Sequence, residues 1–182
     1  MVYYGSRDLA ASFRQVRSNT VQIAEDIPEN KYSFKATPET LSIGQTLVHI
    51  ALSPQFQSHV HRNQIRDLKD LNFQELFETF RAEEAKPRTK AETIALLKSE
   101  GDAFASYVEG LPDVFLAEEV AMPPGRDPAM KTRFEMLLSV KEHEMHHRGQ
   151  LMVLQRMIGI VPHLTRVMEQ RMAQRAAAAQ TR

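Results

Sequence analysis

The 182-residue sequence contains no cysteine. This absence excludes disulfide bonds, cysteine-ligated zinc, iron–sulfur clusters and cysteine nucleophiles. A metal site or reactive centre would have to use the seven histidines, the carboxylates or the hydroxyls. The first eight residues also lack the apolar segment of a secretory signal, and we therefore expect a cytoplasmic protein.

Neither sign of charge is in excess, because 23 Lys and Arg residues balance 23 Asp and Glu residues. A domain that binds nucleic acid usually carries a clear basic surface, so we expect no nucleic-acid partner. The sequence has no run of about 18 apolar residues, so we expect no membrane span. The 42% apolar and 25% charged residues are typical of one soluble globular domain.

Signals for helix starts and stops recur along the chain, whereas strand signals are sparse. Capping-box patterns stand at 42–45, 89–92 and 132–135, where a Ser or Thr is followed three residues later by Gln or Glu. The sequence therefore predicts an all-α fold. The expected helices cover residues 7–26, 42–60, 73–84, 90–109 and 132–158, and a helix-prone tail follows residue 164.

Four long helices with long connections favour a helix bundle. We divide the chain into a helical bundle domain at residues 1–165 and a helix-prone C-terminal tail at residues 166–182 that frays at its end. Pro54 should kink or interrupt the second helix, because proline lacks the N–H that a helix interior needs. Residues 112–131 should form a proline-rich loop, with a short extended piece at 114–120.

His143 and His147 lie on the apolar face of the last long predicted helix. At 100° per residue they are about 40° apart, and Met136 and Leu151 fall within about 80° of His143. Each buried imidazole has a donor and an acceptor that need partners, and a divalent metal satisfies one nitrogen on each ring. Zinc proteases use the same i, i+4 spacing. The alternative is a pair of hydrogen-bonded core histidines or a polar seam between helices.

His49 is the best candidate for a third ligand, because the apolar residues three, seven and eleven positions later share its face. His59 and His61 point about 80° and 120° away from it. His146 falls on a charged flanking face and is excluded, and His163 should be exposed beyond the helix end. Three imidazoles with open coordination positions are typical of a catalytic site and suit Zn, Ni or Fe.

Other residues near the histidine pair lead to smaller expectations. The phase of the helix lets Gln150 hydrogen-bond a ligand ring, whereas it turns Glu142 and Glu144 away, so no general base is assigned. Gly149 inside a helix suggests a close helix crossing. A second apolar stripe predicts either a homodimer interface or contact with another helix of the chain, and consists of Phe134, Leu138, Met145 and Met152.

Residues 143–150 read His-x-x-x-His-Arg-Gly-Gln, and together with His49 they resemble the DinB-like family of four-helix-bundle metalloproteins. The resemblance extends over roughly residues 6–165. It implies an up-up-down-down bundle with one long crossover, frequently dimeric, to which this chain adds a short helix and the helical tail. It also implies a metal held by His49, His143 and His147.

Characterised members of that family include bacillithiol-dependent S-transferases and mycothiol-dependent isomerases. The resemblance therefore implies a metal-dependent thiol transferase or hydrolase that acts on a small-molecule substrate, with a low-molecular-weight thiol as a further cofactor. The alternative is a non-catalytic, metal-stabilised bundle that serves as a binding or stress-response module. A role in DNA damage rests on the family's name alone, and the balanced charge argues against direct DNA contact. Catalytic and cofactor-binding residues are not assigned.

Overall fold

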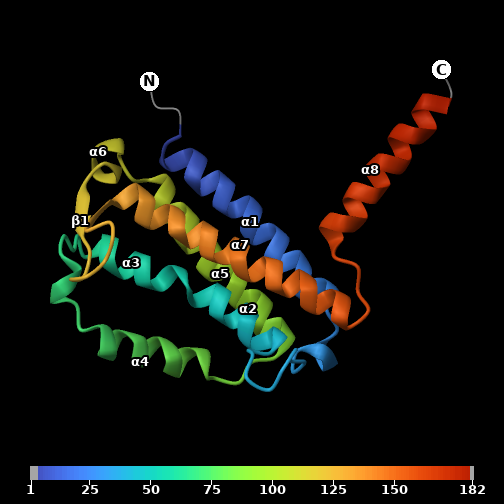
Figure 1. Ribbon diagram of the computed structural model, residues 1–182, viewed down its shortest axis with the longest axis horizontal. Helices are drawn as coiled ribbons and strands as arrows, with labels where there is room; N and C mark the ends of the chain where they lie inside the picture. Colours follow the sequence, from blue (N-terminus) through green and yellow to red (C-terminus); the bar gives the residue numbers. More distant parts are fainter. Residues whose placement is uncertain (1–3, 181–182) are drawn as a thin grey trace.

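The bundle in the computed structural model, which describes residues 4–180, is built from four long helical segments (Figure 1). They are α1 (Ser6–Asp26), α2 (Ile43–Leu52) continued by α3 (Pro54–Arg62), α5 (Lys90–Glu109) and α7 (Arg133–Met157). The other elements are η1 (Glu29–Lys31), η2 (Leu68–Asp70), α4 (Phe73–Glu84), α6 (Asp113–Leu116), β1 (Glu119–Ala121), β2 (Met130–Thr132) and α8 (His163–Gln180). The predicted all-α bundle is confirmed.

α1 and α7 run one way, and α2–α3 and α5 run the other (Figure 1). In chain order the directions are therefore up, down, down and up, which differs from the up-up-down-down order that the resemblance implied. Because α2–α3 and α5 are parallel, the chain must return along the bundle between them. The crossover that does so contains α4, which lies alongside α2 outside the bundle (Figure 1).

Local sequence signals set the helix boundaries. The three capping boxes form as predicted, at Ser42–Gln45, Thr89–Glu92 and Thr132–Glu135. Each satisfies two backbone N–H groups that the helix leaves free. Pro54 interrupts the second predicted helix and becomes the first residue of α3, where its missing N–H costs no hydrogen bond.

The segment 112–131 is more ordered than the predicted loop. Residues 113–116 form the short helix α6, and β1 pairs antiparallel with β2 through Val120 and Lys131. The extended piece expected at 114–120 was therefore placed too early. Pro112 stands at the N-cap of α6 and Asp113 in its first turn, both of which favour a helix start.

One buried ion pair joins all four bundle helices. Arg17 of α1 donates through Nε to both carboxylate oxygens of Glu144 on α7, at 3.0 and 3.1 Å. Its remaining N–H groups donate to the carbonyl of Leu97 on α5 at 2.7 Å and to that of Ile50 on α2 at 3.2 Å. Gly101 makes room for this side chain, because a Cβ there would lie 2.7 Å from Cγ of Arg17.

Two smaller predictions were wrong. Gly149 is exposed, and a Cβ added to it would meet nothing within 4 Å, so it marks no close helix crossing. His163 is half-buried rather than exposed, with Nε2 3.3 Å from Oδ1 of Asn19 on α1. The reason is that α8 begins at His163 and holds the ring against the bundle.

The second stripe of α7 is mostly covered by the chain itself. Phe134 and Leu138 pack on the core cluster that α1, α5 and α7 share, and Met152 packs on the other main cluster. Met145 alone of the four is exposed. A homodimer therefore stays a prediction.

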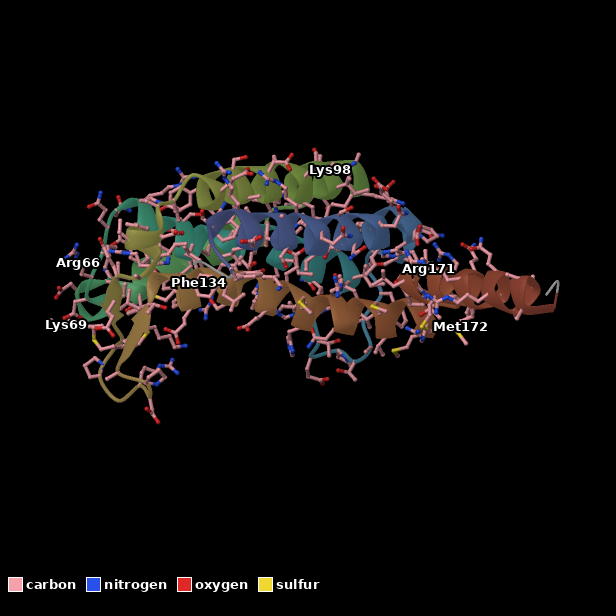
Figure 2. The ribbon with its side chains drawn as sticks, turned by 90° about the horizontal axis from the view of Figure 1, so that it is seen from above. Arg66, Lys69, Lys98, Phe134, Arg171 and Met172 are labelled. Atoms are coloured by element: carbon pink, nitrogen blue, oxygen red, sulfur yellow. The ribbon has the colours of Figure 1, made fainter. Side chains whose placement is uncertain are left out.

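The C-terminal helix projects away from the bundle (Figure 1), and Figure 2 shows Arg171 and Met172 at the opposite end of the molecule from Arg66 and Lys69. The predicted division at residues 165 and 166 falls inside this helix, which continues to Gln180. Within residues 4–180, no helix is both long and apolar enough to cross a membrane.

Candidate metal centre

The three predicted ligands meet at the interface of α2 and α7. Nε2 of His49 lies 3.1 Å from Nε2 of His143, and Nε2 of His147 lies 3.2 Å from the same atom. One ligand atom from each ring lies within 4.8 Å of the other two. The structure therefore brings all three histidines together, two from one helix and one from another.

The bundle core explains why the rings converge. His143 and His147 are one turn apart on α7, so their side chains project in nearly the same direction. Each half of the site is also next to the buried ion pair, because Glu144 follows His143 and the carbonyl bound by Arg17 belongs to the residue after His49. The pair therefore fixes α2 and α7 relative to each other at the level of the site.

Two of the rings have a hydrogen-bond partner on the nitrogen that faces away from the site. Nδ1 of His49 lies 2.7 Å from Oε1 of Glu84, and Nδ1 of His147 lies 2.7 Å from Oε1 of Gln150. Carboxylate and amide oxygens accept hydrogen bonds, so both Nδ1 atoms carry the proton and both Nε2 atoms present a lone pair. His147 thus donates a hydrogen bond to Gln150, which is a contact that the phase of the helix allowed.

These lone pairs fit a metal better than a hydrogen-bond network. Nε2 of His143 faces two acceptors, and a neutral ring has at most one proton to donate. With Zn–N distances of about 2.0–2.1 Å, two ligand nitrogens lie about 3.3 Å apart at the tetrahedral angle and about 2.9 Å apart at a right angle. The observed 3.1 and 3.2 Å fall between these values. His143 is therefore spaced from each of the other two rings as two ligands of one cation would be.

The environment keeps the rings of α7 in the form that binds metals. Burial, and then the neighbouring rings of His147 and His49, lower the pKa of His143 to about 4. Burial also lowers the pKa of His147. Both rings are consequently neutral at pH 7, and a metal would not have to displace a proton from them.

Glu84 is the site residue that sequence reasoning missed. It stands at the end of α4, and its approach to His49 depends on the path of the long crossover. A signal was nevertheless present, because Glu84 follows Phe73, Phe77 and Phe80 at the spacing of one helical face. Glu84 continues the helix face formed by these aromatic residues, and its carboxylate contacts the ring of His49.

The remaining histidines of the sequence analysis stay outside the site. His146 is exposed, as expected, and His59 is exposed on α3. His61 is buried in a separate network, where Nε2 lies 3.1 Å from Oε1 of Gln57 and Nδ1 lies 3.1 Å from a guanidinium nitrogen of Arg133.

Two cavities border the triad of His49, His143 and His147. The first, which we name the aromatic pocket, has a volume of about 380 Å³, and its lining includes His49, His143, Phe56, Phe77, Phe80 and Arg81. The second, the aliphatic pocket, measures about 460 Å³, and its lining includes His147, Leu41, Val153, Leu154 and Met157. Both volumes are in the range of small-molecule sites.

The chain is similar in sequence and fold to known proteins. The sequence model of the DinB superfamily matches residues 12–151, which include all three histidines and Gln150. YjoA of Bacillus subtilis (strain 168) is 26% identical over 154 residues, which is 85% of this chain and 91% of YjoA.

Solved structures share the fold. The crystal structure of YjoA, a DinB-like protein, superposes with a TM-score of 0.62 at 22% identity, covering 83% of this chain and 92% of that one. A DinB-like protein from Bacillus cereus ATCC 10987 gives a TM-score of 0.66 at 16% identity, with 88% and 97% covered. YfiT of B. subtilis, described as a probable metal-dependent hydrolase with an unusual four-helix bundle topology, gives 0.64 at 13% identity, with 85% and 88% covered. Since the superfamily model matches well over half of the sequence, the chain belongs to the DinB superfamily.

Proposed function

We propose that this protein is a divalent-metal-dependent enzyme that transfers a thiol to a small molecule or hydrolyses one, with the metal held by His49, His143 and His147. One observation carries the proposal. Two ring nitrogens that present lone pairs, Nε2 of His49 and Nε2 of His147, lie 3.1 and 3.2 Å from the third, Nε2 of His143, beside open cavities.

The donor set supports catalysis over a purely structural metal. Structural zinc sites usually have four protein ligands, whereas catalytic sites keep a position free for substrate or water. Among the described residues, the only group of His, Asp and Glu side chains close enough to hold a metal is this triad of three. When bound, a divalent metal such as Zn, Ni or Fe acts as a Lewis acid and lowers the pKa of a coordinated thiol or water.

The chain's own groups orient the ligands. Glu84 accepts a hydrogen bond from Nδ1–H of His49, which fixes the tautomer and makes Nε2 more basic. Gln150 does the same for His147 with a neutral oxygen. The pockets on either side could receive a thiol cofactor and a second substrate. The fold shared with YfiT supports hydrolysis, and the resemblance of the 143–150 motif supports thiol transfer.

Metal content and coordination test the proposal. Protein purified without an affinity tag should contain close to one divalent metal per chain by elemental analysis. Replacing any one triad histidine by alanine should remove most of it, while the control His59→Ala, which alters an exposed ring on α3, should keep it. Metal that persists in all three triad variants would refute the site.

Cobalt substitution then separates the enzyme from its alternative. Added thiol or other small ligands should change the visible spectrum of the Co(II) protein, because a catalytic site has positions that they can enter. A spectrum that no added ligand changes, with a large loss of melting temperature on chelation, would instead establish a non-catalytic bundle held together by its metal.

A further inference from the structure

One charged side chain in the lining of the aromatic pocket makes no ion pair or hydrogen bond with the rest of the described chain. Arg81, on α4, is exposed and lines the pocket, and no ion pair or hydrogen bond of its guanidinium occurs among residues 4–180. The other charged residue of that helix in the lining, Glu84, is already bound to His49. Arg81 therefore offers an unpaired positive charge beside the candidate metal centre.

The polar side chains around Arg81 are already engaged. The hydroxyl of Ser53 donates to the carbonyl of Ile50, and that of Ser139 donates to the carbonyl of Met136. Gln57 pairs with His61 through its amide oxygen. Since no group within residues 4–180 accepts a hydrogen bond from the guanidinium, an anion entering the pocket would meet its five donors without displacing a protein group.

The rest of the wall is aromatic. Phe56 and Phe77 stack with ring centroids 6.1 Å apart and planes 11° apart, and Phe77 meets Phe80 edge-on at 6.5 Å. Phe77 is 45% exposed although it belongs to this cluster. A flat, partly uncovered phenyl surface next to a cavity is one that an apolar ligand body can cover, with removal of that surface from water.

Helix geometry places these features in order along α4. Phe77, Arg81 and Glu84 are spaced i, i+4 and i+7, so each stands about one turn, or 5.4 Å, from the next on a similar face. Glu84 contacts the ring of His49, so the Cα of Arg81 lies about one helical turn from the end of the pocket that borders the candidate metal centre. A ligand that reaches from Arg81 to that centre would therefore be short.

We propose that the aromatic pocket recognises a small carboxylic acid with an aromatic or branched apolar body. Arg81 holds the carboxylate, Phe56, Phe77 and Phe80 cover the body, and the group to be transformed lies toward the triad. This inference rests on the proposed function for the identity of the reacting end. The recognition of the carboxylate and the body depends on α3 and α4 alone and can be measured without turnover.

Matched probes test it on the full chain. By isothermal titration calorimetry, 3-phenylpropionate should bind the zinc-loaded protein about tenfold more tightly than its uncharged amide, 3-phenylpropanamide, and than acetate. Arg81→Gln should weaken the acid about tenfold and leave the amide unchanged, since it removes only the charged partner. Phe77→Ala should weaken both the acid and the amide by a similar factor.

Lys86→Gln is the control, because it removes the same charge near the end of α4 from a residue outside the aromatic pocket. It should leave both probes unchanged. Equal binding of acid and amide, or an equal loss in Arg81→Gln and Lys86→Gln, would overturn the assignment. So would acid binding that disappears with the metal and is indifferent to Arg81→Gln, because the carboxylate would then be a metal ligand.

The same titrations keep this inference apart from the proposed function. If the triad variants lose the metal but Arg81 has no effect on acid binding, the metal centre stands and the carboxylate pocket is wrong. If the chain binds no metal but the acid still prefers wild type over Arg81→Gln, the pocket stands and the proposed function is wrong. The variants of Phe77, Arg81 and Lys86 alter exposed side chains of α4 or of the residues just after it, and a circular dichroism melt confirms that each is folded.

Discussion

The two helices that build the site are held in the molecule in different ways. α7 supplies two of the three rings, buries residues along its whole length and crosses the bundle next to the Arg17–Glu144 pair. α4 supplies Glu84 and much of the pocket wall, yet none of its residues is buried. The ligand geometry therefore depends on the bundle core, whereas the partner carboxylate and the recognition surface depend on a helix packed lightly against its outside.

The largest loss of stability should come from breaking the buried Arg17–Glu144 pair at the centre of the bundle. Glu144→Ala leaves the buried guanidinium of Arg17 without its counter-charge and should lower the free energy of unfolding by about 3–5 kcal/mol. Urea denaturation measures it. Glu109→Ala, which breaks an exposed pair with Arg14, should cost less than about 1 kcal/mol. Similar losses in the two variants would contradict the central role of the buried pair.

Acid pH should also lower the free energy of unfolding of the bundle. Burial, and then the charge of Arg133, lower the pKa of His61 to about 4 in the folded chain from an ordinary value of 6.5. The unfolded chain therefore binds this proton first, and stability falls as the pH drops from about 6.5 to about 4, by up to about 1.4 kcal/mol per pH unit from this ring. Above pH 6.5 the ring adds no pH dependence.

Unfolding free energies at pH 7, 6 and 5 check this sign. His61→Gln removes the titrating ring and should show a shallower loss of stability with acid than wild type. His59→Gln, at an exposed ring of the same helix, should follow wild type. Parallel pH profiles for all three proteins would show that His61 titrates alike in the folded and unfolded chains.

When the contact between Glu84 of α4 and His49 is altered, metal affinity should change with little change in the stability of the fold. Glu84→Gln replaces the carboxylate that orients His49, and the loss of such a partner typically weakens metal binding by about 10- to 100-fold. A zinc competition titration measures the affinity, and the midpoint of a thermal melt of the metal-free protein should change little, because no residue of α4 is fully buried. Glu83→Gln, whose carboxylate pairs with Lys86 and Arg88, is the matched control. An equal effect in both variants would count against a specific role of Glu84.

The smallest expected change is a gain. Gly149→Ala fills open space on the exposed side of α7, where alanine favours the helix by about 0.5–1 kcal/mol over glycine. Chemical denaturation should show this increase, with zinc affinity unaltered. A destabilised variant would mean that a neighbour approaches Gly149 after all, as the sequence had suggested.

How much the sequence could predict differs between the same two helices. Periodicity alone put His143 and His147 on one apolar face, and the phase of α7 allowed Gln150 to reach one of the rings, which proved to be that of His147. His49 needed an apolar face on a second helix and the family resemblance. These are properties that a helix carries within its own residues, and they were recoverable.

What was missed depends on neighbours far away in the chain. Glu84 reaches His49 only because the crossover brings α4 back along α2, and Gly101 is needed only because Arg17 enters from α1. Gly149 had the same local appearance as Gly101 and the opposite surroundings. β1 and β2 are three residues each, too short for an alternating pattern to be recognised.

The light packing of α4 has a consequence for how such proteins diverge. Since its aromatic and charged residues add little to the folding of the bundle, they are free to mutate without unfolding the scaffold that carries the histidines. A library randomised at the positions of Phe77, Phe80 and Arg81 should thus yield many soluble variants with altered ligand preference. A change of ligand specificity destabilises the protein least where the fold depends least on the side chains that are exchanged.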